Sequence, residues 1–253
     1  MNVLNKLDRY YNEFKGEKFS IGKTYLGKDI YCFCVSKTLH PKIVVTYSIH
    51  AREYITTFLA LKQIERFRKH GKRGTVYFIP AVNPDGIEIC LKAKPLYKAN
   101  ARGVDLNVNF DAGWGKGKTN VFSPADENYV GKCPFSERET RALRDFTLAV
   151  NPSATISYHS KGEEIYYEFH QDEKAKRRDY LIAEKLAFVT GYKIKSTPNS
   201  YGGYKDWCIE RLKIPAFTIE VGKDNLKHPI TRKNLGKIYR KNKKVICTLT
   251  ESI

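Results

Sequence analysis

The chain has 253 residues, which is long enough for one large domain or two small ones with a substantial buried core. Charged residues make up 28% of it and hydrophobic residues 42%, which excludes an intrinsically disordered chain. The formal net charge of +18 indicates an anionic partner, although the lysines and arginines form only short clusters, at 174–178 and 237–244. Such runs are usually solvated faces, and no recognition motif for nucleic acid accompanies them, so we expect no nucleic-acid partner.

The N-terminal residues 1–9 contain no apolar signal segment, and no apolar run approaches the roughly 20 residues that a membrane span needs. The six cysteines include no Cys-x-x-Cys pair. We therefore expect a cytoplasmic protein with reduced cysteines and no membrane partner, and we leave the oligomeric state open.

Helical and strand periodicities alternate in the first half of the chain. Residues 2–15 have the apolar spacing of an amphipathic helix, and residues 18–36 that of two strands joined by a turn at 26–29. Further on, the sequence predicts a buried strand at 42–49, a helix at 54–69, a strand at 75–81, a loop at Asn83-Pro84-Asp85-Gly86 and a long surface loop at 111–135.

The second half continues the alternation. Ser136 and Glu139 have the spacing of a capping box, which predicts a helix that runs to about Val150. Then follow a strand at 154–159, a helix at 172–190, a loop of small residues at 196–203, a helix at 204–211, a strand at 215–221 and one terminal helix at 231–249. Alternating strands and helices predict a sheet covered on both faces, and nothing marks a second domain.

Three predicted strands end in chemically reactive side chains: His50, His159 and Glu220. Glu53 follows His50 by three residues, so that both side chains share a face if a helical turn begins there. Ligands bind beyond the carboxyl ends of strands in open α/β sheets. Two histidines and a carboxylate form a known ligand set for catalytic zinc, with Glu220 left over as a general base.

An ordered series of motifs resembles the zinc carboxypeptidase family. His50-Ala51-Arg52-Glu53 is similar to its His-x-x-Glu zinc motif. The others follow in the order of the family: Asn83 to Gly86, Gly103-Val104-Asp105-Leu106-Asn107, the strand that ends in His159, Gly202-Gly203 before Asp206-Trp207, and the strand that ends in Glu220. The resemblance extends from about Phe19 to the last helix, and the ordered set is far more specific than any one motif.

The resemblance implies a single-domain α/β/α sandwich over residues 1–253, with a mixed, mostly parallel sheet of about eight strands and no prodomain or wall-binding repeat. It implies one zinc ion, bound by His50, Glu53 and His159, and Glu220 as the general base. Carried over to this sequence, the remaining roles are oxyanion stabilisation by Arg102 and substrate binding by Arg52, Asn107 and Tyr201.

Two positions narrow the expected substrate. Ordinary carboxypeptidases of the family have an arginine after the asparagine, which clamps the terminal carboxylate, but this chain has Val108. Lys205 precedes Asp206-Trp207, where the family places the base of the pocket for the residue after the scissile bond. These features resemble the bacterial peptidases that cut the γ-D-glutamyl-meso-diaminopimelate bond of peptidoglycan stem peptides, because Lys205 can meet the extra carboxylate of diaminopimelate. The basic chain would attract such an acidic peptide.

Two alternatives remain open. The first is a general metallocarboxypeptidase that removes C-terminal residues, with another residue in place of the clamp at Val108. The second, of a different class, is a non-catalytic protein that binds cell-wall peptides. The presence of Glu220 argues against the second, because a binding protein has no need of a general base.

Overall fold

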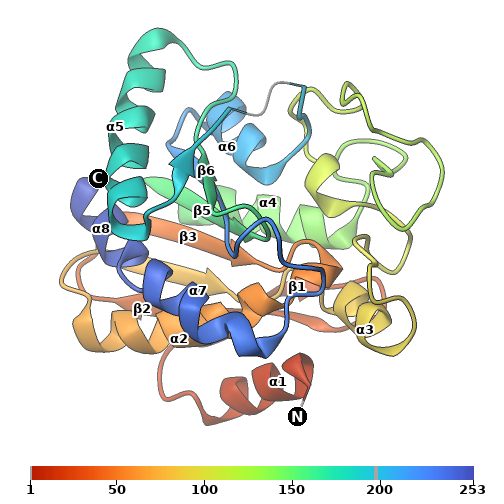
Figure 1. The fold of residues 1–253 in the computed structure, drawn as a ribbon, viewed down its shortest axis with the longest axis horizontal. Helices are drawn as coiled ribbons and strands as arrows, with labels where there is room; N and C mark the ends of the chain where they lie inside the picture. The colour runs from red at the N-terminus through yellow and green to blue at the C-terminus, as the bar shows by residue number, and fades with distance from the viewer. Residues whose placement is uncertain (1, 197–198) are drawn as a thin grey trace.

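The structure, a computed structural model, describes residues 2–196 and 199–253. An eight-stranded sheet forms its centre (Figure 1), with the strand order β1-β2-β4-β3-β5-β8-β6-β7. The strands are β1 (Lys18–Lys23), β2 (Asp29–Ser36), β3 (Lys42–Tyr47), β4 (Thr75–Ile79), β5 (Ala154–His159), β6 (Glu164–Tyr166), β7 (Lys193–Ile194) and β8 (Ala216–Glu220). β4, β3, β5 and β8 are parallel, whereas β1, β2 and β6 each pair antiparallel with a neighbour. The predicted mixed, mostly parallel sheet is confirmed.

Helices cover both faces of the sheet (Figure 1). One face packs against α2, α5, α7 and α8, with α1 at its edge, and the other packs against α4 and α6. The helices are α1 (Val3–Glu13), α2 (Ile55–His70), α3 (Pro84–Lys92), α4 (Arg138–Val150), α5 (Glu173–Thr190), α6 (Tyr204–Leu212), α7 (Leu235–Asn242) and α8 (Val245–Ser252), with 3₁₀ turns η1 (Ala51–Glu53), η2 (Leu106–Val108) and η3 (Arg232–Asn234).

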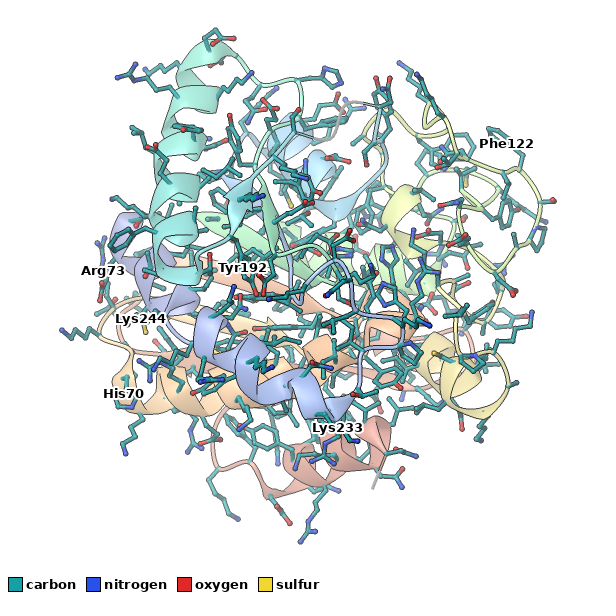
Figure 2. The ribbon with its side chains drawn as sticks, in the orientation of Figure 1. His70, Arg73, Phe122, Tyr192, Lys233 and Lys244 are labelled. Carbon is teal, nitrogen blue, oxygen red and sulfur yellow. The ribbon has the colours of Figure 1, made fainter. Side chains whose placement is uncertain are left out.

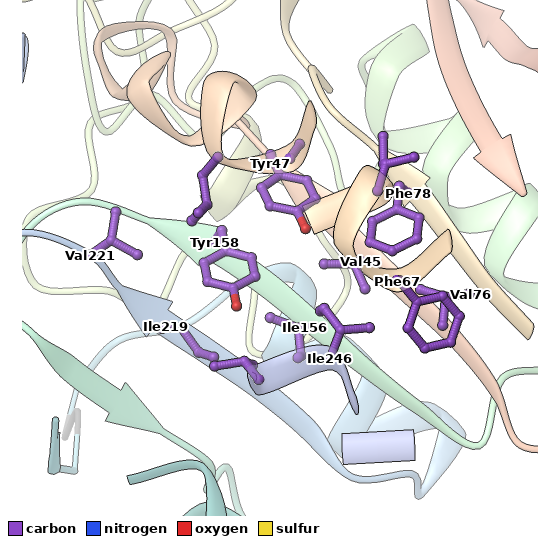
Figure 3. Packing of buried hydrophobic residues seen from close by; sticks show 14 of the residues in the cluster. Val45, Tyr47, Phe67, Val76, Phe78, Ile156, Tyr158, Ile219, Val221 and Ile246 are labelled. Atoms are coloured by element: carbon purple, nitrogen blue, oxygen red, sulfur yellow. The ribbon is translucent and has the colours of Figure 1, made fainter. Parts of the chain in front are cut away.

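Side chains of the central strands alternate between the two layers, as a period of two requires. In β3, Val45 and Tyr47 belong to one apolar core and Val44 to the other. Figure 3 shows the first core, where the rings of Tyr47 and Tyr158 stack with centroids 4.9 Å apart. The Tyr47 hydroxyl donates to Gln63 Oε1 (2.7 Å), and Gln63 Nε2 donates to the Tyr158 hydroxyl (2.9 Å). Gln63 of α2 therefore joins the two strands that lead to His50 and His159.

The structure corrects two helix starts. Asn83 to Gly86 is not a loop but the beginning of α3, because Asn83 caps the helix through its bond from Gly86 N–H and Pro84 fits the first helical position. The capping box at Ser136 and Glu139 is also wrong. Glu137 is the N-cap of α4 and makes no side-chain cap bond, while Glu139 turns inward and accepts a hydrogen bond from Asn100.

The C-terminal segment differs as well. One helix was expected over 231–249, but η3, α7 and α8 divide it, and α7 ends at Asn242. The buried Asn242 side chain donates to the Tyr192 hydroxyl and to the Ile238 carbonyl, which fixes this end of α7 against the core. The short strands β6 and β7 were not predicted, because two or three residues carry too little periodicity. Within the described residues, every helix is too short or too polar to cross a bilayer.

Candidate metal centre and active site

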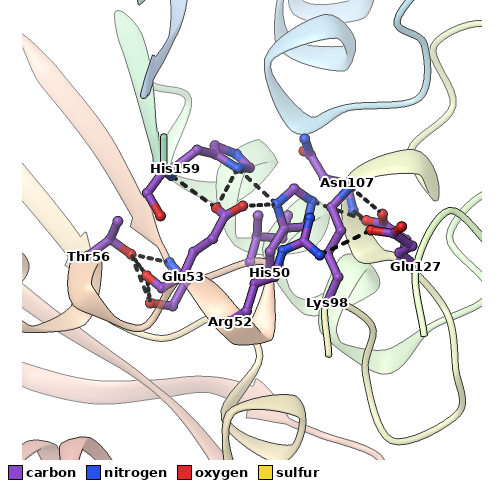
Figure 4. Close-up of polar contacts among 12 residues, drawn as sticks. His50, Arg52, Glu53, Thr56, Lys98, Asn107, Glu127 and His159 are labelled. Carbon is purple, nitrogen blue, oxygen red and sulfur yellow. Dashed lines mark hydrogen bonds and ion pairs between the residues drawn. The ribbon is translucent and has the colours of Figure 1, made fainter. Parts of the chain in front are cut away.

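His50, Glu53 and His159 converge beyond the carboxyl ends of β3 and β5 (Figure 4). Glu53 Oε1 lies 2.9 Å from His50 Nδ1, and Glu53 Oε2 lies 3.1 Å from His159 Nδ1. The two Nδ1 atoms are 3.1 Å apart. Burial alone would raise the pKa of Glu53, but His50 and His159 hold it well below its ordinary value. The carboxylate therefore occupies the centre of the cluster as an anion.

Backbone turns after β3 bring Glu53 back towards His50. Residues 51–53 form a 3₁₀ turn, and not the first turn of the following α-helix as expected. Ser48 has a left-handed φ of 49°, and its hydroxyl lies within hydrogen-bonding distance of the Thr56 and Thr57 hydroxyls (2.9 and 2.8 Å). These contacts anchor the turn to the start of α2, which fixes the spacing between imidazole and carboxylate.

The three side chains suit a zinc ion. One ligand atom from each residue lies within 4.8 Å of the others, and all three residues are buried. Two imidazole nitrogens and a carboxylate oxygen are the donors of one class of catalytic zinc site, which keeps a further position open. The donor set therefore fits the metal that the sequence predicts.

Asp105 contacts the nitrogen of His50 that does not face Glu53 and His159. Its Oδ1 atom lies 3.2 Å from His50 Nε2, and its Oδ2 atom lies 2.9 Å from Lys98 Nζ. Burial would raise the pKa of Asp105, but the positive charges of Lys98 and His50 hold it well below its ordinary value. A carboxylate on the far nitrogen of a ligating histidine fixes the tautomer and the ring orientation.

Glu220 lies beside the ligands as the register partner of His159 across β5 and β8. Its Oε2 atom is buried and has no hydrogen-bond partner among the described residues. Burial raises the pKa of Glu220 to about 8, with the carboxylates of Glu53 and Glu164 adding to the rise against the attraction of His159 and Lys98. An unengaged carboxyl with a pKa near neutrality has the properties of a general base.

A cleft of about 250 Å³ opens onto these groups. Its described lining consists of His50, Lys98, Asn107, Val108, Thr119, Asn128, His159, Tyr166, Ser200, Gly203, Lys205, Asp206, Thr218 and Glu220. The predicted residues Asn107 and Lys205 are therefore brought together with the ligands. Thr119 and Asn128 come from the long loop that the sequence places at 111–135, so this loop forms one wall.

The ammonium group of Lys205 is a buried positive charge in the lining of the cleft. Its Nζ atom donates to the Glu168 carbonyl (2.8 Å) and to Asp206 Oδ1 (2.5 Å). The ammonium group also lies 5.6 Å from the centre of the Phe169 ring. Because an ammonium has three donors, one remains for a ligand.

Three predicted side chains lie elsewhere. The Arg102 guanidinium lies over the Tyr25 ring (5.4 Å) and its Nε atom is 3.9 Å from Glu137. Arg52 binds Glu127 and the Leu96 carbonyl, each at 3.2 Å, as Figure 4 shows in part. Tyr201 stacks on His170 in a neighbouring pocket. None of the three belongs to the described lining of the cleft, so the placement does not fit the oxyanion role predicted for Arg102.

Sequence reasoning missed Lys98 and Asp105. Although burial would lower it, the Asp105 carboxylate keeps the pKa of Lys98 above its ordinary value, so a cation faces the cleft. Lys98 lies in the same polar segment as Arg102, four residues earlier, and no periodicity in that segment decides between them. Asp105 lies within the Gly-Val-Asp-Leu-Asn motif, where its acidic character was the available signal.

Comparison with known proteins agrees with this architecture. Solved structures with the same fold include bovine thrombin-activatable fibrinolysis inhibitor, with a TM-score of 0.83, 23% identity and coverage of 98% of this chain and 93% of that one. Murein-tripeptide amidase MpaA from Escherichia coli O157 has a TM-score of 0.65 and 22% identity, over 96% of this chain and 94% of that one.

Curated relatives are more similar in sequence. γ-D-Glutamyl-L-diamino acid endopeptidase 1 from Lysinibacillus sphaericus is 30% identical over 91% of this chain and 66% of its own length. Carboxypeptidase B from Bos taurus is 28% identical over 80% of this chain, which spans 57% of that protein. A family model described as zinc carboxypeptidase matches residues 2–244. The chain therefore belongs to the zinc carboxypeptidase family.

Proposed function

We propose that this chain is a zinc-dependent peptidase that hydrolyses the γ-D-glutamyl-meso-diaminopimelate bond of peptidoglycan stem peptides, with one zinc ion bound by His50, Glu53 and His159. One observation carries the substrate: the lining of the cleft combines Val108, where ordinary carboxypeptidases have their arginine clamp, with the buried cation of Lys205. The name of the Lysinibacillus relative, an endopeptidase for γ-D-glutamyl-L-diamino acid bonds, supports the same substrate class.

In the proposed reaction, the zinc ion, Glu220 and Lys98 have separate roles. A zinc ion bound there supplies a Lewis acid that polarises the scissile carbonyl and lowers the pKa of a water molecule. Glu220 accepts the proton of the attacking water and returns it to the leaving amine. Lys98 places a positive charge where the oxyanion develops, and its ion pair with Asp105 holds that charge in position before the reaction.

Two further groups select the substrate. Asn107 Oδ1 accepts a hydrogen bond from Tyr204 N–H (3.1 Å), which leaves the amide NH₂ of Asn107 to donate to a substrate carboxylate. The remaining N–H of Lys205 donates to the second carboxylate of diaminopimelate, which is a charge-assisted hydrogen bond. A substrate with two carboxylates on its leaving residue therefore satisfies both donors.

The test is mass-spectrometric detection of diaminopimelate released from L-Ala-γ-D-Glu-meso-diaminopimelate by the zinc-loaded protein, with Glu220→Gln as the control. Release by the parent and not by the variant is the expected result. No release from this tripeptide, together with trimming of ordinary peptides, would replace the proposal with a general metallocarboxypeptidase. Inactivity on both substrates with zinc bound would point to a binding protein.

A further inference from the structure

The proposed chemistry does not use the strong positive charge of the C-terminal segment. Between Asp224 and Glu251 the chain has no carboxylate side chain and eight basic ones, namely Lys227, Arg232, Lys233, Lys237, Arg240, Lys241, Lys243 and Lys244. Figure 2 labels Lys233 and Lys244 near the two ends of the α7 segment. Within the described part of the chain, Lys241 alone among the eight forms an ion pair, with Glu163 at 2.8 Å.

One groove beside α7 has a volume of about 860 Å³. Its basic lining residues are Lys223, Lys237, Arg240 and Lys241, and the carboxylate in its described lining is Glu163, which Lys241 already neutralises. The groove lies between α7, the end of α5 and the loop that follows β8. Among the described residues, its other three cations form no ion pair, and they lie around a space that is accessible to a ligand.

A second groove, of about 560 Å³, lies on the other side of α7, against α1 and α2. Its cationic lining residues are Lys6, Lys62, Arg66, Lys69 and Arg232. Its carboxylate is Glu65, which binds the Arg68 guanidinium (3.1 Å) and accepts a hydrogen bond from the Tyr10 hydroxyl. We call the basic residues of the two grooves, together with Lys233, the α7 basic surface.

The α7 basic surface exposes few apolar side chains, and this restricts the kind of partner that it can bind. The large exposed hydrophobic side chains of the described chain lie outside α2 and α7, although Phe188, at the end of α5, is exposed beside residues that line the larger groove. Two aromatic rings of the smaller groove have cations over them, because Lys62 lies 5.1 Å from the centre of the Tyr239 ring and Arg232 lies 4.9 Å from that of Phe58. Stacking of successive nucleic-acid bases needs several free aromatic faces, and insertion into a bilayer needs a group of exposed apolar side chains, whereas Phe188 is a single exposed ring.

We propose that the α7 basic surface binds a flexible, linear phosphodiester polymer without bases, which lies along α7 and in the grooves beside it. Cations about one turn apart on α7, such as Lys237 and Arg240, are separated by about 4.5 Å along the helix axis, so that neighbouring phosphates can each meet one. Release of counterions from such a polymer favours binding at low salt. A flat bilayer would not enter the grooves.

This surface adjoins the active site. Gly222 and Lys223 line the larger groove and lie two and three residues after Glu220. The Gly222 carbonyl accepts a hydrogen bond from Gly162 N–H (2.8 Å) in the loop after His159. A polymer bound to the α7 basic surface would lie close to the active-site cleft without entering the cleft. The inference does not depend on the proposed substrate.

The test measures affinity for fluorescently labelled poly(glycerol phosphate) as a function of salt. The variant Lys233→Glu/Lys237→Glu/Arg240→Glu changes three exposed side chains without ion pairs. Lys174→Glu/Arg177→Glu/Lys185→Glu on α5 is the matched control, because it makes the same change of net charge on exposed residues elsewhere. We expect the first variant to weaken binding at least tenfold and to lower the slope of log K against log salt by about two, following 0.7 per phosphate contact.

The control variant should weaken binding less than threefold, and both variants should retain the parent's melting temperature and its activity on a small soluble peptide. Equal losses in the two triple variants would overturn the proposal, because they would show attraction to net charge alone. Tighter binding of an oligonucleotide of equal charge, or of anionic phosphatidylglycerol vesicles, than of the polymer would also overturn it.

Discussion

His159 and Glu220 are direct partners on the parallel strands β5 and β8, so that a candidate metal ligand and the carboxyl proposed as the base project side by side from one edge of the sheet. Neighbouring strands lie about 4.8 Å apart, and register partners share a face. The distance between ligand and base is therefore set by the hydrogen-bond ladder of the sheet rather than by a loop.

Replacing Glu220 by glutamine should separate catalysis from metal binding. The amide keeps the shape of the side chain but cannot accept the proton, so we expect kcat to fall by about 10²–10⁴-fold. Zinc content, measured by inductively coupled plasma mass spectrometry, should remain that of the parent, since Glu220 is outside the ligand set. Loss of zinc in this variant would contradict the assignment of Glu220 as base.

Lys98, and not Arg102, should be needed for the chemical step. Lys98→Ala removes the cation in the cleft and is expected to lower kcat/KM by about 10²–10³-fold, the usual effect of losing one oxyanion donor. Lys98→Arg should recover part of the activity, because it restores the charge. Arg102→Ala is the matched control and should stay within about twofold of the parent; a loss as large as that of Lys98→Ala would restore Arg102 to the site.

Lys205 should control the preference for diaminopimelate over lysine in the leaving position. Both residues extend the same chain, but only diaminopimelate carries the second carboxylate. A hydrogen bond between charged groups contributes about 1.5–3 kcal/mol, so Lys205→Met should reduce the ratio of the two kcat/KM values by about 10–100-fold. The ratio cancels any general loss of active protein. An unchanged ratio would show that Lys205 does not contact the second carboxylate.

Glu139 should make the free energy of unfolding depend on pH. Burial, reinforced by the nearby Glu137 and Asp85 carboxylates against a hydrogen bond from Asn100, raises the pKa of Glu139 from 4.5 to about 7. Between these values the folded state keeps a proton that the unfolded state has lost, so stability falls as pH rises from about 4.5 to about 7.

Glu139→Gln removes this titration. The variant should therefore gain about 1–3 kcal/mol relative to the parent at pH 8, and close to nothing at pH 4.5. Urea unfolding at the two pH values measures the difference. A gain that is equal at both values would show that the carboxyl does not titrate in this range.

The sequence could predict that His50, His159 and Glu220 lie together, because each of the three follows a local signal. His50, His159 and Glu220 end β-branched or aromatic runs, and parallel strands bring such ends to one edge whatever the loops do. Lys98 and Arg102 could not be separated in this way, because they lie in irregular chain whose side-chain directions depend on tertiary contacts such as that between Lys98 and Asp105.

The errors in secondary structure have a similar origin. Asn-Pro-Asp-Gly has the composition of a turn, but the same asparagine and proline also begin helices, and only the helical surroundings of α3 decide between the two. Asn242 ends α7 through bonds to Tyr192 and Ile238, of which the first is made across 50 residues of sequence. No local pattern records such a contact.

Gln63 gives the metal centre a property that none of its ligands has alone. Its amide joins Tyr47 on the strand before His50 to Tyr158 beside His159, it also donates to the Asn242 carbonyl at 3.0 Å, and it belongs to the helix that starts just after Glu53. A single side chain thus connects the three segments that carry the candidate ligands. A substitution of Gln63 would therefore disturb the positions of all three candidate ligands together. We expect the affinity for the metal to fall before the protein unfolds.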